Sequence, residues 1–147
     1  MSSARNTALR LLGRRDYTTA ELRKKLMERE CPADEIDAAI ASLTTDRLLD
    51  DRRAAAAHVR TATRIKRRGR LRIQQELQAR GLERGLIREL LDALPPEEET
   101  AAIAQFLQRK HSGRIAMADR RRLFQQLLRR GFSADAIAKA LRTREET

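Results

Sequence analysis

The sequence predicts an all-α fold of three tandem three-helix repeats, arranged as an elongated, curved array. Only 3% of its 147 residues are aromatic and 36% are charged, so a core has to be built from Leu, Ile, Val and Ala, the usual mixture of packed helices. Apolar residues recur at helical spacing along the chain. Three segments also align without gaps, with a period of about 50 residues that is typical of helical repeats.

The aligned segments are residues 21–36, 72–87 and 122–137. Each begins with two apolar residues four positions apart, which lie on one face of a helix and are expected to be buried. Gly81 and Gly131 then share a column in which glycine can adopt the left-handed conformation that closes a helix, whereas the first repeat has Glu30 there. The apolar pairs are Leu22 and Leu26, Ile73 and Leu77, and Leu123 and Leu127.

A second helix is predicted after this turn in each repeat. An apolar residue stands five positions before an isoleucine, the separation of a hydrophobic staple across a helix start. In the third repeat Ser133 is well placed to cap that helix. The staple pairs are Cys31 and Ile36, Leu82 and Ile87, and Phe132 and Ile137.

A further helix is expected before each pair, near residues 8–12, 54–65 and 101–110, giving nine helices. Thr18 and Glu21 form a predicted capping box, and Asp50 can cap the second of these preceding helices. Pro95 and Pro96 punctuate the second boundary, before three glutamates in a first helical turn. The predicted repeats are 1–49, 50–96 and 97–147. Each closes only a small core, so we expect neighbours to stack into one continuous array.

The charge distribution indicates an anionic partner. The net charge is +11, and most of the cations are arginine, whose planar fork suits phosphates and carboxylates. The run from Arg60 to Arg72 contains no acid, so its charges are expected to repel one another unless a partner compensates them. A second basic stretch spans 109–130. The candidate binding residues are Arg60, Arg64, Lys66, Arg67, Arg68, Arg70, Arg72, Arg120, Arg121 and Arg122.

The aromatic residues argue against readout of bases. Single-strand binders usually expose rings for stacking, but the four rings here fall on apolar stripes or in the staple column and are expected in the core. Contact with phosphates or with an acidic protein face stays open. The rings are Tyr17, Phe106, Phe124 and Phe132.

No catalytic, metal or cofactor site is predicted. His58 and His111 lack other ligands at metal-binding spacing, and Asp50 and Asp51 are better explained by a helix cap. Cys31 is the only cysteine, so an intrachain disulfide is excluded and a reducing cytoplasm is the simplest compartment. Its place in the staple column indicates a packed residue rather than a nucleophile. No apolar run is long enough for a membrane helix. We therefore expect a non-enzymatic protein without a cofactor.

The order and spacing of several motifs resemble the RecX family over essentially the whole chain. The motifs are residues 14–15, 19–22 and 25–26 in the first repeat, 48–51 across the boundary, and Ala55, 68–69, 72–73, 76–77 and 80–82 in the second. The chain departs from the family at Ala54, where its members usually have Phe, so packing there is expected to differ.

The resemblance implies a negative regulator of the RecA recombinase. Such a regulator associates with the RecA–DNA filament and suppresses ATP hydrolysis and strand exchange, with weak DNA binding in some members. We expect a cytoplasmic monomer without membrane association. The alternative is a general nucleic-acid-binding protein that contacts phosphates alone; a nuclease is a weaker third interpretation, because no carboxylate or histidine cluster supports it.

Overall fold

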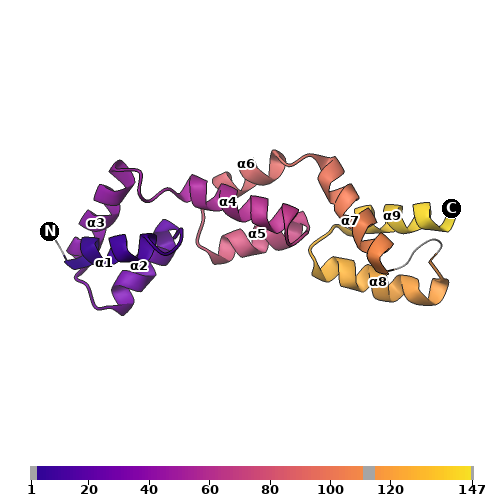
Figure 1. Ribbon diagram of the computed structural model, residues 1–147, viewed down its shortest axis with the longest axis horizontal. Helices are drawn as coiled ribbons and strands as arrows, with labels where there is room; N and C mark the ends of the chain where they lie inside the picture. The colour runs from indigo at the N-terminus through magenta and orange to yellow at the C-terminus, as the bar shows by residue number, and fades with distance from the viewer. Residues whose placement is uncertain (1–2, 111–114, 147) are drawn as a thin grey trace. The chain divides into compact units, whose positions relative to one another are not determined.

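The computed structural model describes residues 3–110 and 115–146, which are all-helical and contain no strand (Figure 1). The predicted all-α class and the nine helices are confirmed for these residues. In chain order, the helices are α1 (Ser3–Leu12), α2 (Thr19–Glu28), α3 (Ala33–Thr45), α4 (Asp51–Arg64), α5 (Arg70–Ala79), α6 (Arg84–Asp92), α7 (Pro96–Lys110), α8 (Met117–Arg129) and α9 (Ala134–Glu146).

The predicted helix caps are present. Thr18 Oγ1 accepts a hydrogen bond from the Glu21 N–H at 3.1 Å, and the Glu21 carboxylate accepts one from the Thr18 N–H at 2.9 Å, so the capping box is complete. Asp50 caps α4 by accepting from the Arg53 N–H at 3.0 Å, and Ser133 caps α9 by accepting from the Ala136 N–H at 3.2 Å. Helix α7 begins at Pro96, whose fixed φ suits a first helical position, and Glu97, Glu98 and Glu99 lie in its first turn as the sequence predicted.

Contacts divide the chain into two compact units that share the middle repeat. Unit 1 contains the residues up to His58 together with Leu77–Ile87, and unit 2 contains Val59–Glu76 together with the residues from Arg88 onward. In unit 1, α1 packs against α2 and α3, and Cys31 is half-buried against their core, as expected for a packed residue. That core consists of Ala8, Leu11, Tyr17, Leu22, Leu26, Ile36, Ile40, Leu43 and Leu49.

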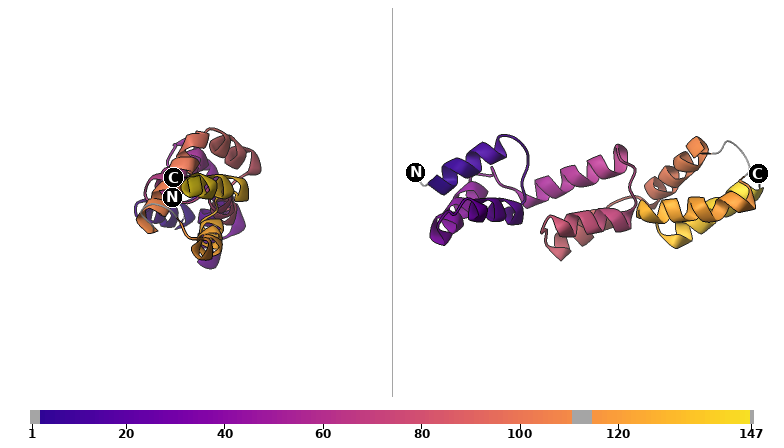
Figure 2. Two further views of the ribbon diagram at one scale, coloured as in Figure 1. Left: turned by 90° about the vertical axis from the view of Figure 1, so that its right-hand side faces the viewer. Right: turned by 90° about the horizontal axis from the view of Figure 1, so that it is seen from below.

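In unit 2, α9 packs against both α7 and α8, and α8 and α9 lie side by side (Figures 1 and 2). Its core is again aliphatic apart from one buried ring, that of Phe132. The core consists of Ala102, Ile103, Leu107, Ile115, Leu123, Leu127, Phe132, Ile137 and Leu141.

The turn after the second helix of each repeat has the same backbone form. Glu30, Gly81 and Gly131 all have positive φ, at 60°, 75° and 93°. In each turn the next N–H donates to a carbonyl near the helix end, as in the bond from Leu82 N to Leu77 O at 3.3 Å. The left-handed glycines are therefore confirmed, and the first repeat uses a glutamate instead.

Two of these turns contact the start of a helix from the preceding repeat. At the first junction, within unit 1, Thr18 Oγ1 donates to the carbonyl oxygen of Arg80 at 2.7 Å. At the second junction, within unit 2, the Gly69 N–H donates to the carbonyl oxygen of Arg130 at 2.7 Å, and the Leu71 N–H donates to Gly131 at 3.0 Å. The turn at Gly131 thereby supplies acceptors for N–H groups at the start of α5 that have no partner within that helix.

Candidate partner-binding surface

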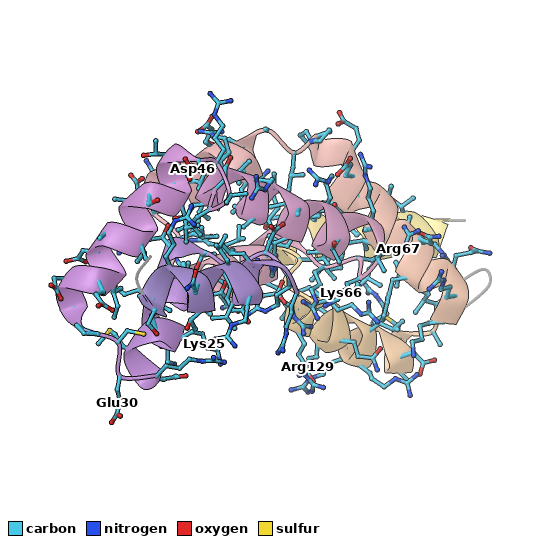
Figure 3. All side chains as sticks on the ribbon, turned by 60° about the vertical axis from the view of Figure 1, so that its left-hand side comes forward. Lys25, Glu30, Asp46, Lys66, Arg67 and Arg129 are labelled. Atoms are coloured by element: carbon cyan, nitrogen blue, oxygen red, sulfur yellow. The ribbon has the colours of Figure 1, made fainter. Side chains whose placement is uncertain are left out.

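The basic run occupies the end of α4, the turn after it and the first turn of α5. Arg60, Arg64 and Lys66 are exposed, Arg67 is half-buried, and none of the four forms an ion pair within the part of the chain that the structure describes. Figure 3 shows Lys66 and Arg67 together at this turn. The end of α4 thus presents cations that the protein itself leaves uncompensated.

The other three arginines of the run are paired, which corrects the expectation that the whole run is unopposed. Arg68 forms an ion pair with Glu76, and Arg72 Nε lies 3.9 Å from the same carboxylate. Arg70 Nη2 lies 3.4 Å from the carboxylate of Asp92. Glu76 follows Arg72 by one helical turn and Asp92 comes from α6, so both acids lie beyond the run in sequence but beside it in space.

The second predicted stretch lies on α8 and offers fewer free cations. Arg122 Nη2 lies 3.1 Å from the carboxylate of Asp119, and Arg120 is half-buried with Nη1 3.4 Å from the sulfur of Met117. Arg121 is exposed. Of the three arginines, Arg121 and the 61% exposed side chain of Arg122 are the ones open to a partner.

The structure also gathers three cations that were not selected as candidate binding residues, Arg109, Lys110 and Arg130, around one that was, Arg67. Arg67, Arg109, Lys110 and Arg130 line a cavity of about 310 Å³ around the ring of Phe106, together with Ala102 and Gln105. The guanidinium carbon of Arg130 lies 4.7 Å from the ring centroid, and Lys110 Nζ lies 5.9 Å from it. No carboxylate lines this cavity, which we call the basic pocket.

The basic pocket revises the interpretation of Phe106 as a core residue. Its ring does pack against the core of unit 2, but it is half-buried and also lies against Arg130. Tyr17 and Phe132 are buried as expected, and Phe124 is half-buried. The spacing of Phe106 from Arg109 and Lys110, three and four residues along α7, was the available signal, because it puts all three on one helix face.

A neighbouring cavity, of about 340 Å³, has mixed charge. Arg64 and Arg67 line it from the basic run, and Glu98 and Glu99 line it from α7. The basic pocket therefore differs from this cavity in having cations but no acid in its lining.

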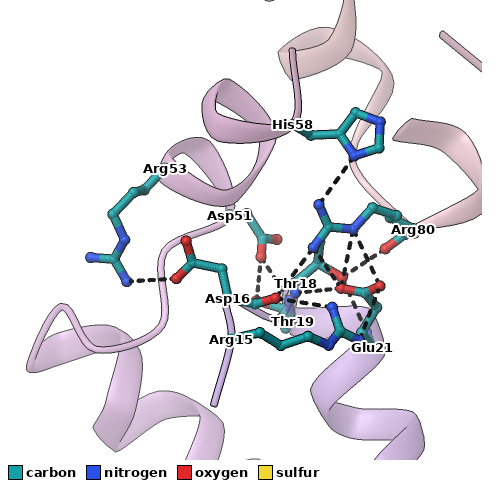
Figure 4. Close-up of polar contacts among 9 residues, drawn as sticks. All are labelled: Arg15, Asp16, Thr18, Thr19, Glu21, Asp51, Arg53, His58 and Arg80. Carbon is teal, nitrogen blue, oxygen red and sulfur yellow. Dashed lines mark hydrogen bonds and ion pairs between the residues drawn. The ribbon is translucent and has the colours of Figure 1, made fainter. Parts of the chain in front are cut away.

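The first junction carries a different network, centred on Arg80 (Figure 4). Its guanidinium donates to the Glu21 carboxylate, with Nη2 to Oε1 at 3.0 Å and Nε to Oε2 at 3.2 Å. Arg80 Nη1 lies 3.4 Å from His58 Nδ1, and Arg15 Nη2 lies 3.9 Å from Glu21. One carboxylate thus neutralises the arginine of this junction.

The electrostatics of Glu21 reflect this network. Burial acts to raise the pKa of Glu21, but the hydrogen bonds from Arg80 and from the Thr18 N–H outweigh it, aided by the charges of Arg80 and Arg15. The pKa of Glu21 therefore lies below its usual value of 4.5. The carboxylate is ionised at neutral pH and holds Arg80 in place.

The residues considered for catalysis or metal binding have structural contacts. Asp51 Oδ1 accepts from the Thr19 N–H at 2.7 Å and from Thr19 Oγ1 at 3.0 Å, which ties the start of α4 to α2. Within residues 3–110 and 115–146, no three His, Cys, Asp or Glu side chains are grouped to hold a metal ion. His111 lies outside the described residues. None of the described helices is long and apolar enough to span a membrane.

Comparison with known proteins identifies the family. Residues 4–43 match the family model described as RecX, first three-helix domain, and residues 50–91 match RecX, second three-helix domain. This chain belongs to the RecX family. It is 36% identical to Regulatory protein RecX of Halorhodospira halophila, over 98% of this chain and 89% of that protein. It is 33% identical to Regulatory protein RecX of Pseudomonas entomophila, over 97% of this chain and 92% of that protein.

Solved RecX structures have the same fold. The crystal structure of RecX from Lactobacillus salivarius superposes with a TM-score of 0.83 at 24% identity, covering 95% of this chain and 93% of that one. The two RecX domain models coincide with α1–α3 and α4–α6. Members of the RecX family are named as regulatory proteins, and the sequence resemblance that predicted the family is confirmed.

Proposed function

We propose that this chain is a negative regulator of the RecA recombinase, which binds the RecA–DNA filament and suppresses its ATPase and strand-exchange activities. Membership of the RecX family supports a regulatory role. We further propose that the protein acts as a cytoplasmic monomer and that its repeats are residues 1–49, 50–96 and 97–147.

One observation carries the choice of an anionic, DNA-bearing partner. Arg60, Arg64 and Lys66 are exposed at the end of α4 and form no ion pair with any described residue. Like charges held this close repel one another, and an anionic surface removes that repulsion when it binds. A recombinase filament on DNA supplies phosphates together with protein contacts.

The test is ATP hydrolysis by RecA on single-stranded DNA with increasing amounts of this protein. We expect inhibition at less than one molecule per recombinase subunit. Uninhibited hydrolysis at equimolar protein would overturn the proposal. Inhibition only at amounts that coat the DNA would favour the second candidate, a general phosphate-binding protein, whose affinity falls steeply with salt, by a logarithmic slope of about 0.7 per phosphate on single strands.

The residues are tested by reversing Arg60, Arg64 and Lys66 to Glu. These are better choices than Arg68 or Arg70, whose reversal would also break ion pairs inside the chain. We expect most of the inhibition at low salt to be lost. Helical circular dichroism has to be retained, because acids near a helix C-terminus oppose the dipole by up to about 1 kcal/mol each.

The matched control reverses three other cations, Arg84, Arg88 and Arg142, which are exposed on α6 and α9 without an ion pair to any described residue. This control changes the net charge by the same amount. Equal loss of inhibition in both variants would reject the end of α4 as the binding surface and leave only a net-charge effect.

A further inference from the structure

The second junction lacks the acid that neutralises the first. At the first junction, Arg80 is bound by Glu21 through contacts of 3.0 and 3.2 Å. Arg130 occupies the same position in the third repeat, but the residue aligned with Glu21 is Arg72. Arg130 has no carboxylate partner within the described chain, and its guanidinium lies against Phe106 instead.

This arrangement leaves the guanidinium of Arg130 able to donate hydrogen bonds to an acceptor on a bound ligand. A guanidinium over an aromatic ring is attracted by the ring without using its N–H donors, which stay available for an acceptor. Arg67, Arg109 and Lys110 line the same cavity, and none of them has an ion pair with a described residue. The cavity volume of about 310 Å³ suits a small group.

We propose that the basic pocket binds a phosphate group, which takes the place at the second junction that the Glu21 carboxylate takes at the first. The proposal rests on the proposed function and deepens it, by naming phosphate as the chemistry that unit 2 contacts. The phosphate is either the internucleotide phosphate of a single-stranded nucleic acid or a free or terminal phosphate.

The number of cations favours phosphate over a side-chain carboxylate. Arginine forks form paired hydrogen bonds with phosphate oxygens, and lysine adds a point charge. A carboxylate has two oxygens and one charge, and at the first junction Arg80 bonds both oxygens while Arg15 lies 3.9 Å away. The four cations around Phe106 match the larger oxygen shell of a phosphate.

The first experiment measures binding of a fluorescent short oligothymidylate to the full chain by anisotropy at low salt. Reversal of Arg109 and Lys110 to Glu is expected to weaken binding about tenfold or more, because attraction is replaced by repulsion at the pocket. The control, Arg84 and Arg88 to Glu, has the same net charge and is expected to change affinity by less than about threefold. Equal losses in the two variants would overturn the site.

Amide chemical shifts distinguish the sources of the phosphate. Shifts around Phe106 and Arg130 caused by inorganic phosphate would indicate a free or terminal phosphate. Shifts caused only by the oligothymidylate would indicate an internucleotide phosphate. Either result supports the proposal. An oligoglutamate peptide that shifts these amides when neither phosphate probe does would overturn it in favour of an acidic protein segment, and no shift with any probe would also overturn it.

A second variant introduces a carboxylate at the second junction, at the position aligned with Glu21. Arg72→Glu places a carboxylate where the first junction has Glu21, so it is expected to pair with Arg130 and compete with phosphate. The substitution also removes the 3.9 Å contact between Arg72 and Glu76, which is why helicity is measured with it. Affinity for the oligothymidylate should fall about threefold to tenfold more than in Arg84→Glu, which changes the charge equally. Equal affinity in Arg72→Glu and Arg84→Glu, with helicity retained in both, would contradict the equivalence of the two junctions.

These measurements contain no recombinase, so the two proposals fail separately. If the protein inhibits RecA but does not bind phosphate at this pocket, the phosphate proposal fails and the regulatory proposal holds. If wild-type protein binds phosphate here but never inhibits RecA, the regulatory proposal is the one that fails.

Discussion

At the first junction the carbonyl oxygen of Arg80 accepts a hydrogen bond from the hydroxyl of Thr18, and at the second the carbonyl oxygen of Arg130 accepts one from the backbone N–H of Gly69. Both bonds are 2.7 Å long. Thr18 and Gly69 are aligned residues just before the second helix of a repeat. The backbone arrangement is therefore repeated, while the chemical groups that complete it differ.

The side chains around this common backbone differ in charge. Arg80 is neutralised by Glu21, whereas Arg130 lies against Phe106 in a pocket without an acid. An ion pair thus contributes to the stability of the first junction, whereas the positive charge at the second junction is not compensated by an acid in the pocket. This difference is open to test by substitution at aligned positions.

The largest effect is expected from truncating the buried leucines that share one repeat column. Leu77 in unit 1 and Leu127 in unit 2 are both 0% exposed. Replacing either with Ala should cost about 2–5 kcal/mol, because a cavity adds to the lost transfer energy. Urea unfolding, combined with hydrogen exchange of each unit, measures the cost. A loss below about 0.5 kcal/mol would contradict burial between helices.

The next effect concerns the two left-handed glycines. A Cβ at Gly131 would overlap Cβ and the backbone of Arg72, whereas a Cβ at Gly81 would overlap only the Cβ of Ala20, an exposed side chain. Gly131→Ala should cost about 2–4 kcal/mol and Gly81→Ala about 1–3 kcal/mol, of which left-handed backbone accounts for about 1–2 in each. Thermal unfolding measures which substitution costs more, and a larger cost at Gly81 would show that overlap with the backbone of Arg72 does not decide the difference.

Local features were predictable from sequence because short segments determine them. The capping box of Thr18 and Glu21 and the glycines at 81 and 131 depend on a few neighbouring residues, and each was found where the sequence placed it. The three glutamates at 97–99 likewise lie in the first turn of α7, and Pro96, which was interpreted as punctuation, is itself the first residue of that helix.

The charge pairing was not predictable in the same way. Asp92 reaches Arg70 from a different helix, so the acid that compensates the run is absent from the run itself. The basic pocket joins Arg67, Phe106 and Arg130, which are far apart in sequence, through contacts between helices. Sequence spacing shows which residues share one face of one helix. It does not show which faces of different helices meet, so it cannot predict a site that is assembled from several helices.

A smaller effect is expected from the Arg80–Glu21 ion pair, through its pH dependence. The pKa of Glu21 is lowered in the folded protein, so its contribution to stability is present above the unfolded value near 4.5 and is lost as pH falls through the folded pKa. Glu21→Gln should lower stability at pH 7 by about 1–3 kcal/mol, since it removes a charged partner from a partly buried arginine. In urea unfolding the difference from wild type should shrink below pH 4.5; a constant difference would mean that the carboxylate charge contributes nothing.

The smallest effect is expected at Glu30, the first-repeat residue aligned with Gly81 and Gly131. Glu30 has φ 60° and is exposed, so its side chain collides with nothing and only the left-handed backbone is unfavourable. Glu30→Gly relieves that strain but also gives the unfolded chain more freedom, and the two terms leave a net gain of up to about 1 kcal/mol. Glu30→Ala keeps the left-handed cost and serves as the control for loss of the charge. If thermal unfolding shows glycine and alanine to be equally stable at this position, backbone strain is not what separates the first turn from the other two.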